Sequence, residues 1–266
     1  MKRVLTGCIL IPLVIFIVLY TSAFWILVAS SALTLLALLE FNNLAILKTR
    51  DRRADALAVL AGVVVPSILF FCGVAAFVPV LLAAVFVFFL SSFVCGRELK
   101  DSAADVAFKA LGLAYIALPF SYFALISRLE NGRWWIIFLF AVIWANDTFA
   151  YCVGKRLGRH RLCPAISPKK TVEGALGGLA GGIIAALLID RFAGLGASYA
   201  GVVVLSVLLG LVGMAGDLAE SVLKRGAGVK DSGTIVPGHG GVLDRTDSLI
   251  FTVPVLFYYL TLHPVA

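Results

Sequence analysis

The feature that most constrains this 266-residue chain is a succession of apolar runs, each close to the length needed to cross a lipid bilayer. A transmembrane helix needs about 20 mostly apolar residues. Such runs predict helices over residues 5–20, 22–46, 54–73, 76–95, 107–127, 134–152, 172–190, 198–222 and 245–262. With 61% hydrophobic and only 14% charged residues, the chain is too apolar for a soluble globular domain. We therefore expect an all-α polytopic membrane protein with about nine transmembrane helices.

The first apolar run could be mistaken for a removable leader, because it follows Met1-Lys2-Arg3 and extends to Tyr20. There is no convincing small-residue cleavage site before the second run begins, so we expect the first run to be retained as a transmembrane helix. Residues 1–106 then hold about four spans. Residues 107–266 hold about five spans and contain the motifs that carry the chemistry.

The distribution of basic residues predicts the orientation. With the N-terminus in the cytoplasm and the C-terminus outside, every Lys and Arg except Arg128, Arg133 and Arg191 falls in or beside a cytoplasmic loop. This asymmetry follows the positive-inside rule, and Trp134 and Trp135 then lie at the outer interface, which indoles prefer. The net charge of +7 is explained by these loops, so it does not indicate a nucleic-acid partner.

Carboxylates gather toward the cytoplasmic ends of the later predicted helices. They are Asp147, Asp217, Glu220, Asp244 and Asp247, with Glu173 at the start of the helix predicted over 172–190. An acidic residue costs about 2.5–3.5 kcal/mol at the centre of a membrane helix, so such residues usually mark function. Taken singly, some of them could be helix-end residues that reach water. Together, their oxygen ligands favour a site for Mg²⁺, which neutralises phosphate oxygens.

Basic and glycine-rich segments adjoin these carboxylates. Asp217, Glu220, Ser221 and Lys224 recur at helical spacing, so they form one polar stripe. The loop that follows contains Arg225 and Lys230 and continues through His239, Gly240 and Gly241 to Arg245. An earlier loop offers Lys169 and Lys170 before Thr171, a candidate N-cap, and a helix N-terminus flanked by lysines is a ready anion site. His239 could act as a general base or orient a phosphate.

These segments resemble the conserved blocks of the phosphatidate cytidylyltransferases, the integral-membrane CDP-diacylglycerol synthases. The resemblance rests on four stretches of this sequence: Asn146-Asp147-Thr-Phe-Ala-Tyr151, Ser167-Pro-Lys169-Lys170-Thr171-Val-Glu173-Gly174, Gly216-Asp217-Leu-Ala-Glu220-Ser221, and Lys230-Asp231-Ser-Gly233 through Pro237-Gly-His239-Gly240-Gly241 to Asp244-Arg245-Thr246-Asp247. It covers about residues 146–247, and more than twenty positions match in order.

The resemblance implies transfer of the cytidylyl group of CTP to phosphatidate, which gives CDP-diacylglycerol and pyrophosphate. The lipid phosphate would attack the α-phosphorus directly, so positioning and charge neutralisation should dominate catalysis. The implied metal is Mg²⁺ or Mn²⁺, held by Asp217 and Asp244 with Glu220 and Asp247. Asp147 and Lys224 are further candidate catalytic residues. The implied substrate-binding residues are Lys169, Lys170, Ser221, Arg225, Lys230, His239, Gly240, Gly241 and Arg245.

The resemblance also implies a bacterial cytoplasmic-membrane protein, a homodimer, with its active site facing the cytoplasm and its lipid substrate in the bilayer. Two alternatives stay open at this point. A CTP-dependent polyprenol or dolichol kinase would share the nucleotide and the membrane setting. A cation-coupled transporter would also carry intramembrane acids, but it should place them near the midplane and show inverted repeats, and no repeat is visible here.

Overall fold

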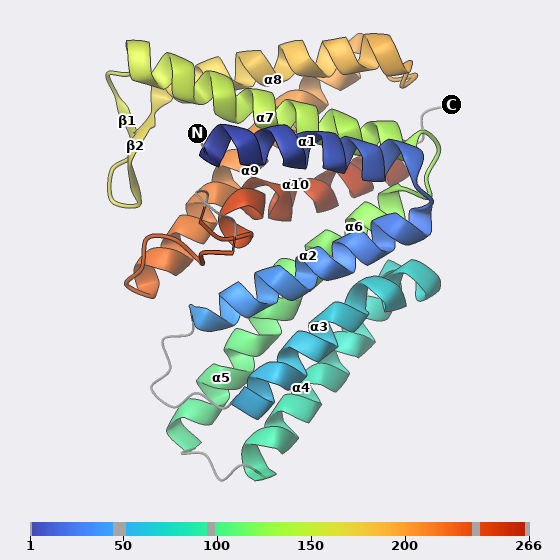
Figure 1. Ribbon diagram of the computed structural model, residues 1–266, viewed down its shortest axis with the longest axis vertical. Coiled ribbons are helices and arrows are strands. Elements are labelled where there is room, and N and C mark those ends of the chain that lie inside the picture. The colour runs from blue at the N-terminus through green and yellow to red at the C-terminus, as the bar shows by residue number, and fades with distance from the viewer. Residues whose placement is uncertain (1, 45–51, 95–98, 236–239, 264–266) are drawn as a thin grey trace. The chain divides into compact units, whose positions relative to one another are not determined.

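The computed structural model describes residues 2–44, 52–94, 99–235 and 240–263, and they are almost entirely helical (Figure 1). The helices are α1 (Lys2–Tyr20), α2 (Ala23–Asn43), α3 (Arg52–Cys72), η1 (Val74–Ala76), α4 (Phe77–Val94), α5 (Leu99–Gly112), η2 (Leu113–Ala117), α6 (Leu118–Ile126), α7 (Gly132–Leu157), α8 (Val172–Ala193), α9 (Tyr199–Gly226) and α10 (Leu243–Leu262). Two short strands, β1 (Arg161–Cys163) and β2 (Ser167–Thr171), interrupt this pattern. The predicted all-α architecture is confirmed, with one hairpin added to it.

Seven helical segments within the described ranges are long and apolar enough to cross a membrane. They cover α2, α3, η1 with α4, α5 through α6, α7, α8 and α9. The described apolar part of α1, Ile9–Tyr20, is shorter. Helix α10 begins with Asp244, Arg245 and Asp247 and falls outside this set. A polytopic membrane protein is therefore confirmed, whereas the count of nine spans and the orientation of the termini stay predictions.

The chain divides into two compact units, each assembled from separate segments. Unit 1 contains residues 1–11, 21–125 and 226–245, and unit 2 contains residues 12–20, 126–225 and 246–266. The division predicted from the sequence, between residues 1–106 and 107–266, was based on where the motifs lie, and it stays a prediction.

Unit 1 is built around the packing of α2 against α3 and α5. A Cβ at Gly62 of α3 would lie 2.2 Å from a methyl group of Leu38, so the absence of a side chain lets α3 approach α2 closely. On the neighbouring face, the rings of Phe41 and Phe108 stack with their centroids 4.3 Å apart. The ammonium group of Lys109 is buried and pairs with the carboxylates of Asp105 and, at 3.5 Å, Asp55, which ties α5 to α3.

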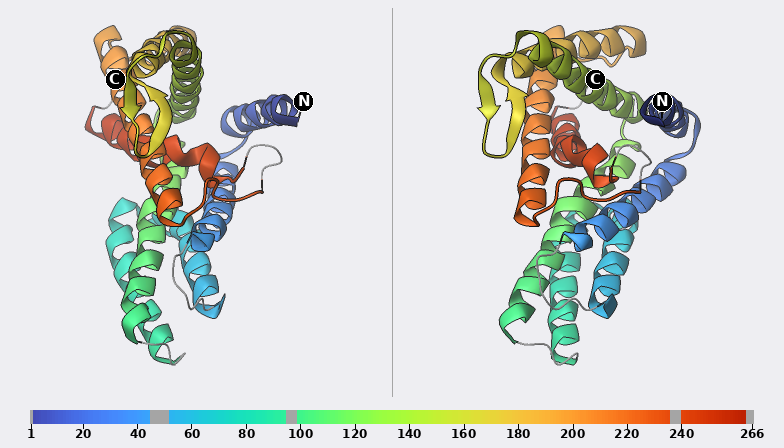
Figure 2. Two further views of the ribbon diagram at one scale, coloured as in Figure 1. Left: turned by 90° about the vertical axis from the view of Figure 1, so that its left-hand side faces the viewer. Right: turned by 60° about the vertical axis from the view of Figure 1, so that its left-hand side comes forward.

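Unit 2 is built around α7 and α8, which pack side by side along their lengths (Figures 1 and 2). Glycines on α8 make this contact close: a Cβ at Gly177 would lie 2.5 Å from the side chain of Val153, and one at Gly181 would lie 2.5 Å from the ring of Phe149. Small residues at a helix interface allow the backbones to approach in this way. The same contact brings the last turns of α7 beside the first turn of α8.

The chain between α7 and α8 forms an antiparallel hairpin of β1 and β2, with Arg161 opposite Thr171 and Cys163 opposite Ser167. Glu173 holds the base of the hairpin, because its carboxylate accepts hydrogen bonds from the backbone N–H groups of Arg159 (3.0 Å) and His160 (3.2 Å). The hairpin thereby lies over one end of the α7–α8 pair and beside α9 (Figure 2).

Candidate functional site

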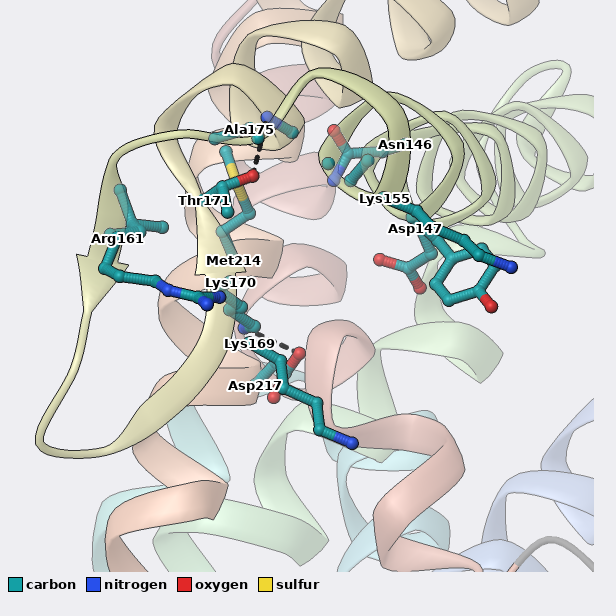
Figure 3. Close-up of a pocket in the computed structure, with 16 residues that line it drawn as sticks. Asn146, Asp147, Lys155, Arg161, Lys169, Lys170, Thr171, Ala175, Met214 and Asp217 are labelled. Atoms are coloured by element: carbon teal, nitrogen blue, oxygen red, sulfur yellow. Dashed lines mark hydrogen bonds and ion pairs between the residues drawn. The ribbon is translucent and has the colours of Figure 1, made fainter.

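A cavity of about 730 Å³ lies in unit 2, where α7, α8, α9 and the hairpin meet (Figure 3). The polar and charged side chains that line it are Asn146, Asp147, Tyr151, Lys155, Arg161, Lys169, Lys170, Thr171 and Asp217. The rest of the lining is glycine, alanine, leucine and methionine. Four cationic side chains face two carboxylates in this lining, so the cavity attracts anions.

The central ion pair of the cavity joins the hairpin to α9. The ammonium group of Lys170 lies 2.6 Å from a carboxylate oxygen of Asp217, and both side chains are partly exposed (Figure 3). The hydroxyl group of Ser221, one turn further along α9, lies 3.5 Å from the other oxygen of Asp217. Lys169 and Arg161, one on each strand of the hairpin, also line the cavity (Figure 3). The cavity therefore combines a fixed ion pair with further positive charge.

The N-terminus of α8 opens on the cavity through Thr171. Its hydroxyl group accepts a hydrogen bond from the backbone N–H of Gly174 at 3.1 Å, so the predicted N-cap is confirmed. A Cβ at Gly154 would lie 2.9 Å from that hydroxyl oxygen, which explains why α7 carries no side chain at this contact. The partial positive charge of a helix N-terminus favours anions. The cap thus adds to the attraction exerted by the lysines.

Further charged residues adjoin Asp217 on α9 and α10. Asp247 lies within electrostatic reach of Asp217, Asp147 and Lys224. A Cβ at Gly216 would lie 2.6 Å from the carbonyl oxygen of Asp247, so the two helix backbones touch at this level. This close approach places the carboxylates of α9 and α10 in one neighbourhood.

Glu220 and Lys224 form a separate pair on α9. Glu220 is fully buried, and its carboxylate contacts the ammonium group of Lys224 one turn along the helix. Lys224 is itself mostly buried, with 11% of its side chain exposed. The position of Glu220 suits a residue that holds Lys224 in place.

In unit 1, Asp244 organises the loop that precedes α10. One of its carboxylate oxygens accepts hydrogen bonds from the backbone N–H groups of Gly241 (2.8 Å) and Ser232 (3.0 Å). Gly240 has a φ of +85°, which a residue with a side chain rarely adopts, and a Cβ there would lie 2.8 Å from the same oxygen. Gly240 therefore lets the backbone at Gly240 and Gly241 approach the carboxylate of Asp244 closely.

Glu40 is a buried residue that supports the segment around Asp244 and that sequence reasoning missed. It lies near the end of α2, it is 1% exposed, and its carboxylate accepts hydrogen bonds from the backbone N–H groups of Val242 (3.0 Å) and Leu243 (2.8 Å) and from the hydroxyl group of Ser232 (3.2 Å). It therefore caps α10 and fixes the loop around Asp244. The signal was present, since Glu40 is the sole acidic residue in the apolar run over 22–46.

The predicted site residues divide between the two units. Asp147, Lys169, Lys170 and Asp217 line the cavity of unit 2, and Glu220, Ser221, Lys224, Arg225 and Asp247 also belong to unit 2. Unit 1 holds Lys230, Gly240, Gly241, Asp244 and Arg245. Of the residues outside the cavity, Arg225, Lys230 and Arg245 are exposed. His239 lies outside the described residues.

The donor set suits a hard divalent cation, because Asp247 of α10 lies within electrostatic reach of Asp217 on α9 and of Asp147 on α7. Across the described ranges, however, no three side chains of His, Cys, Asp or Glu already surround a common point. The carboxylates could hold a divalent cation, but in this structure Asp217 forms an ion pair with Lys170 instead.

The fold and this cavity define a polytopic membrane protein with an anion-attracting site between its helices and a basic hairpin. The chain matches the cytidylyltransferase family over residues 1–263, and it belongs to that family.

Its relatives include proteins named phosphatidate cytidylyltransferase. One from Staphylococcus saprophyticus is 41% identical over 169 residues, which is 64% of this chain and 64% of the relative. One from Bacillus subtilis is 44% identical over 159 residues, which is 59% of each chain. The aligned segments thus span less than two thirds of the length of these relatives.

Proposed function

We propose that this protein transfers the cytidylyl group of CTP to phosphatidate, yielding CDP-diacylglycerol and pyrophosphate. The observation that carries the proposal is the cavity in which Lys170 pairs with Asp217 beside the N-terminus of α8. Such a cavity suits a polyphosphate in a chain of the cytidylyltransferase family. The names of the relatives support phosphatidate as the acceptor.

In the proposed reaction, an oxygen of the lipid phosphate attacks the α-phosphorus of CTP. A new P–O bond forms, the bond between the α-phosphorus and its bridging oxygen breaks, and the electron pair leaves with pyrophosphate. The nucleophile is already an anion, so no side chain has to be activated as a covalent intermediate. The obstacle is repulsion between two polyanions, and fixed cations reduce that repulsion most effectively where water is excluded.

The basic residues would carry this role. Lys169, Lys170 and Arg161 line the cavity and would bind the triphosphate, with the N-terminus of α8 beside them. Lys224 would be held in position by Glu220. The remaining predicted substrate-binding residues are Ser221, Arg225, Lys230, His239, Gly240, Gly241 and Arg245, which would contact the phosphatidate head group or the far end of the triphosphate.

We further propose that the reaction requires Mg²⁺, with Mn²⁺ as a substitute. Asp217 and Asp244 would be the principal ligands. Asp147, Glu220 and Asp247 would be secondary ligands or would orient the lysine and arginine side chains. A bound divalent cation would neutralise phosphate oxygens and polarise the α-phosphorus. Lys170, now paired with Asp217, would then be available to a phosphate oxygen.

The proposed setting is the bacterial cytoplasmic membrane, with the N-terminus in the cytoplasm, the active site facing the cytoplasm and the C-terminus outside. CTP would enter from the cytoplasm, while the acyl chains of phosphatidate remain in the bilayer. The protein would act as a homodimer. A cysteine placed at Lys170 should react with an impermeant reagent only from the cytoplasmic side, and labelling from outside would overturn the orientation.

The test is an assay of purified protein in detergent with phosphatidate and Mg²⁺, run in parallel with CTP labelled at the α- or the γ-phosphorus. Cytidylyl transfer predicts labelled lipid from α-labelled CTP alone. Labelled lipid from γ-labelled CTP would identify a lipid kinase instead. Lipid labelled from ATP without CTP would reject cytidylyl transfer.

A further inference from the structure

Asn146 carries a buried polar group that no part of the described chain satisfies. It lies on α7, it is 2% exposed, and its carboxamide oxygen has no hydrogen-bond partner anywhere in the described ranges. Buried polar side-chain atoms are hydrogen-bonded in the large majority of cases, so each exception calls for an explanation. Asn146 also lines the cavity, which means that its missing partner can come from a ligand.

The neighbouring helices leave room for this carboxamide without bonding to it. A Cβ at Gly178 of α8 would lie 2.6 Å from the carboxamide oxygen of Asn146, and one at Gly210 of α9 would lie 3.5 Å from it. Two glycines on two different helices thus make space for the same side chain. Since no hydrogen bond fixes the carboxamide, it can turn about its Cβ–Cγ bond and present either its oxygen or its amino group to the cavity.

The part of the cavity around Asn146 differs from the part around the ion pair. Figure 3 shows Asn146, with Asp147 next to it, on the α7 side of the cavity, away from Lys169 and Asp217. Ala150, Ala175 and Met214 give the cavity an apolar part of its wall, and Asn146 and Asp147 add polar groups on α7. Apolar walls with a few polar groups that fix orientation are typical of sites for planar organic ligands, whereas phosphates are drawn to the cationic end.

We propose that the Asn146 carboxamide binds the cytosine ring of CTP while the triphosphate extends toward Lys169, Lys170 and Asp217. The inference rests on the proposed function, because CTP is its substrate. Cytosine offers an amino donor next to a ring-nitrogen acceptor, and a carboxamide offers an acceptor next to a donor. Asn146 is then a positioning residue: it sets where the α-phosphorus lies and takes no part in bond making.

The test compares binding of CTP with binding of tripolyphosphate, which has the same chain of phosphates and no base. The variant is Asn146→Leu, which keeps a similar volume and leaves no buried polar atom. Thr148→Val is the matched control, because Thr148 lies on the same helix and its hydroxyl group donates only to the carbonyl oxygen of Trp144. Equilibrium dialysis of the purified full chain with radiolabelled CTP gives Kd without turnover, and tripolyphosphate is measured by competition.

We expect Asn146→Leu to raise the Kd for CTP by about 10- to 100-fold, the range of a good paired contact to a base. The Kd for tripolyphosphate should stay within about twofold, and Thr148→Val should change neither value. Equal weakening of both ligands would overturn the proposal, since Asn146 would then serve the phosphate end or the fold. An unchanged Kd for CTP would overturn it as well. If these Kd values come out as expected but the wild-type protein forms no CDP-diacylglycerol, the proposed function fails while the assignment of Asn146 to the base remains.

Discussion

The substitution Glu40→Gln tests how the loop around Asp244 is held. Each carboxylate oxygen of Glu40 accepts one backbone N–H at the start of α10, from Val242 on one oxygen and from Leu243 on the other. Glutamine supplies one acceptor and one amino group, so one of these N–H groups must face another donor in a buried site. Losing a bond to a charged acceptor costs about 1.5–3 kcal/mol, and an unsatisfied buried donor costs about 1–3 kcal/mol. We expect a loss of about 3 kcal/mol in the free energy of unfolding.

The measurement is thermal unfolding of the purified, detergent-solubilised protein. For chains of about 150–250 residues, 1 kcal/mol corresponds to about 2–4 °C in Tm, so the expected decrease is about 6–12 °C. Glu130→Gln is the matched control, because Glu130 is exposed and the substitution removes the same charge. A Tm for Glu40→Gln within 2 °C of that control would refute the reasoning that Glu40 caps α10.

Three further substitutions test the cavity and the helix contacts. Lys170→Met removes a cation from the cavity and should raise the KM for CTP at least tenfold in initial-rate assays. Arg156→Met, which removes a cation outside the cavity, should leave the KM unchanged. Equal effects of the two substitutions would contradict a local role for Lys170. Thr171→Ala removes the N-cap and should lower the free energy of unfolding by about 1 kcal/mol, whereas Thr171→Ser should stay near wild type. An unchanged Tm for Thr171→Ala in thermal unfolding would count against the cap. Gly216→Ala puts a Cβ 2.6 Å from the carbonyl oxygen of Asp247, so both Tm and turnover should fall; wild-type values for both would mean that the helices need not touch.

The helices could be predicted from hydropathy because each apolar run has to satisfy its backbone internally. Within the described residues, each predicted range coincides with helical structure, and the range 107–127 covers parts of α5, η2 and α6. The ends were less predictable: α7 continues to Leu157, past the predicted end at 152, with Lys155 and Arg156 in its last turn. The apolar run stops where the basic residues begin, but basic residues stabilise a helix C-terminus, so the helix continues beyond the apolar run.

The hairpin and the role of Glu40 could not be predicted from local patterns. Residues 161–171 mix polar and apolar residues, include two prolines and show no alternation, and Glu173 holds the base of the hairpin that they form. Glu40 meets Val242 from 202 residues away in the sequence, a contact that only tertiary packing establishes. The rule that intramembrane carboxylates mark function identified Asp217 and would have identified Glu40 too.

The candidate site was partly predictable. The spacing of charged residues brought out Asp147, Lys169, Lys170 and Asp217, which share one cavity. Asn146 was quoted in a stretch that carries the family resemblance but was given no role, because an amide beside an acidic residue has no distinctive pattern in a sequence. Its importance arises from burial and from the missing partner of its oxygen, both of which are properties of the packed helices.

The most direct test of the central claim is the rate at which purified Asp217→Asn protein forms CDP-diacylglycerol from CTP and phosphatidate, beside wild type. Removing the negative charge at the centre of the cavity should lower turnover at least 100-fold. The variant should remain folded, with a Tm close to that of wild type, because Asp217 is partly exposed. A folded variant that turns over at a near-normal rate would contradict the assignment of this cavity as the active site.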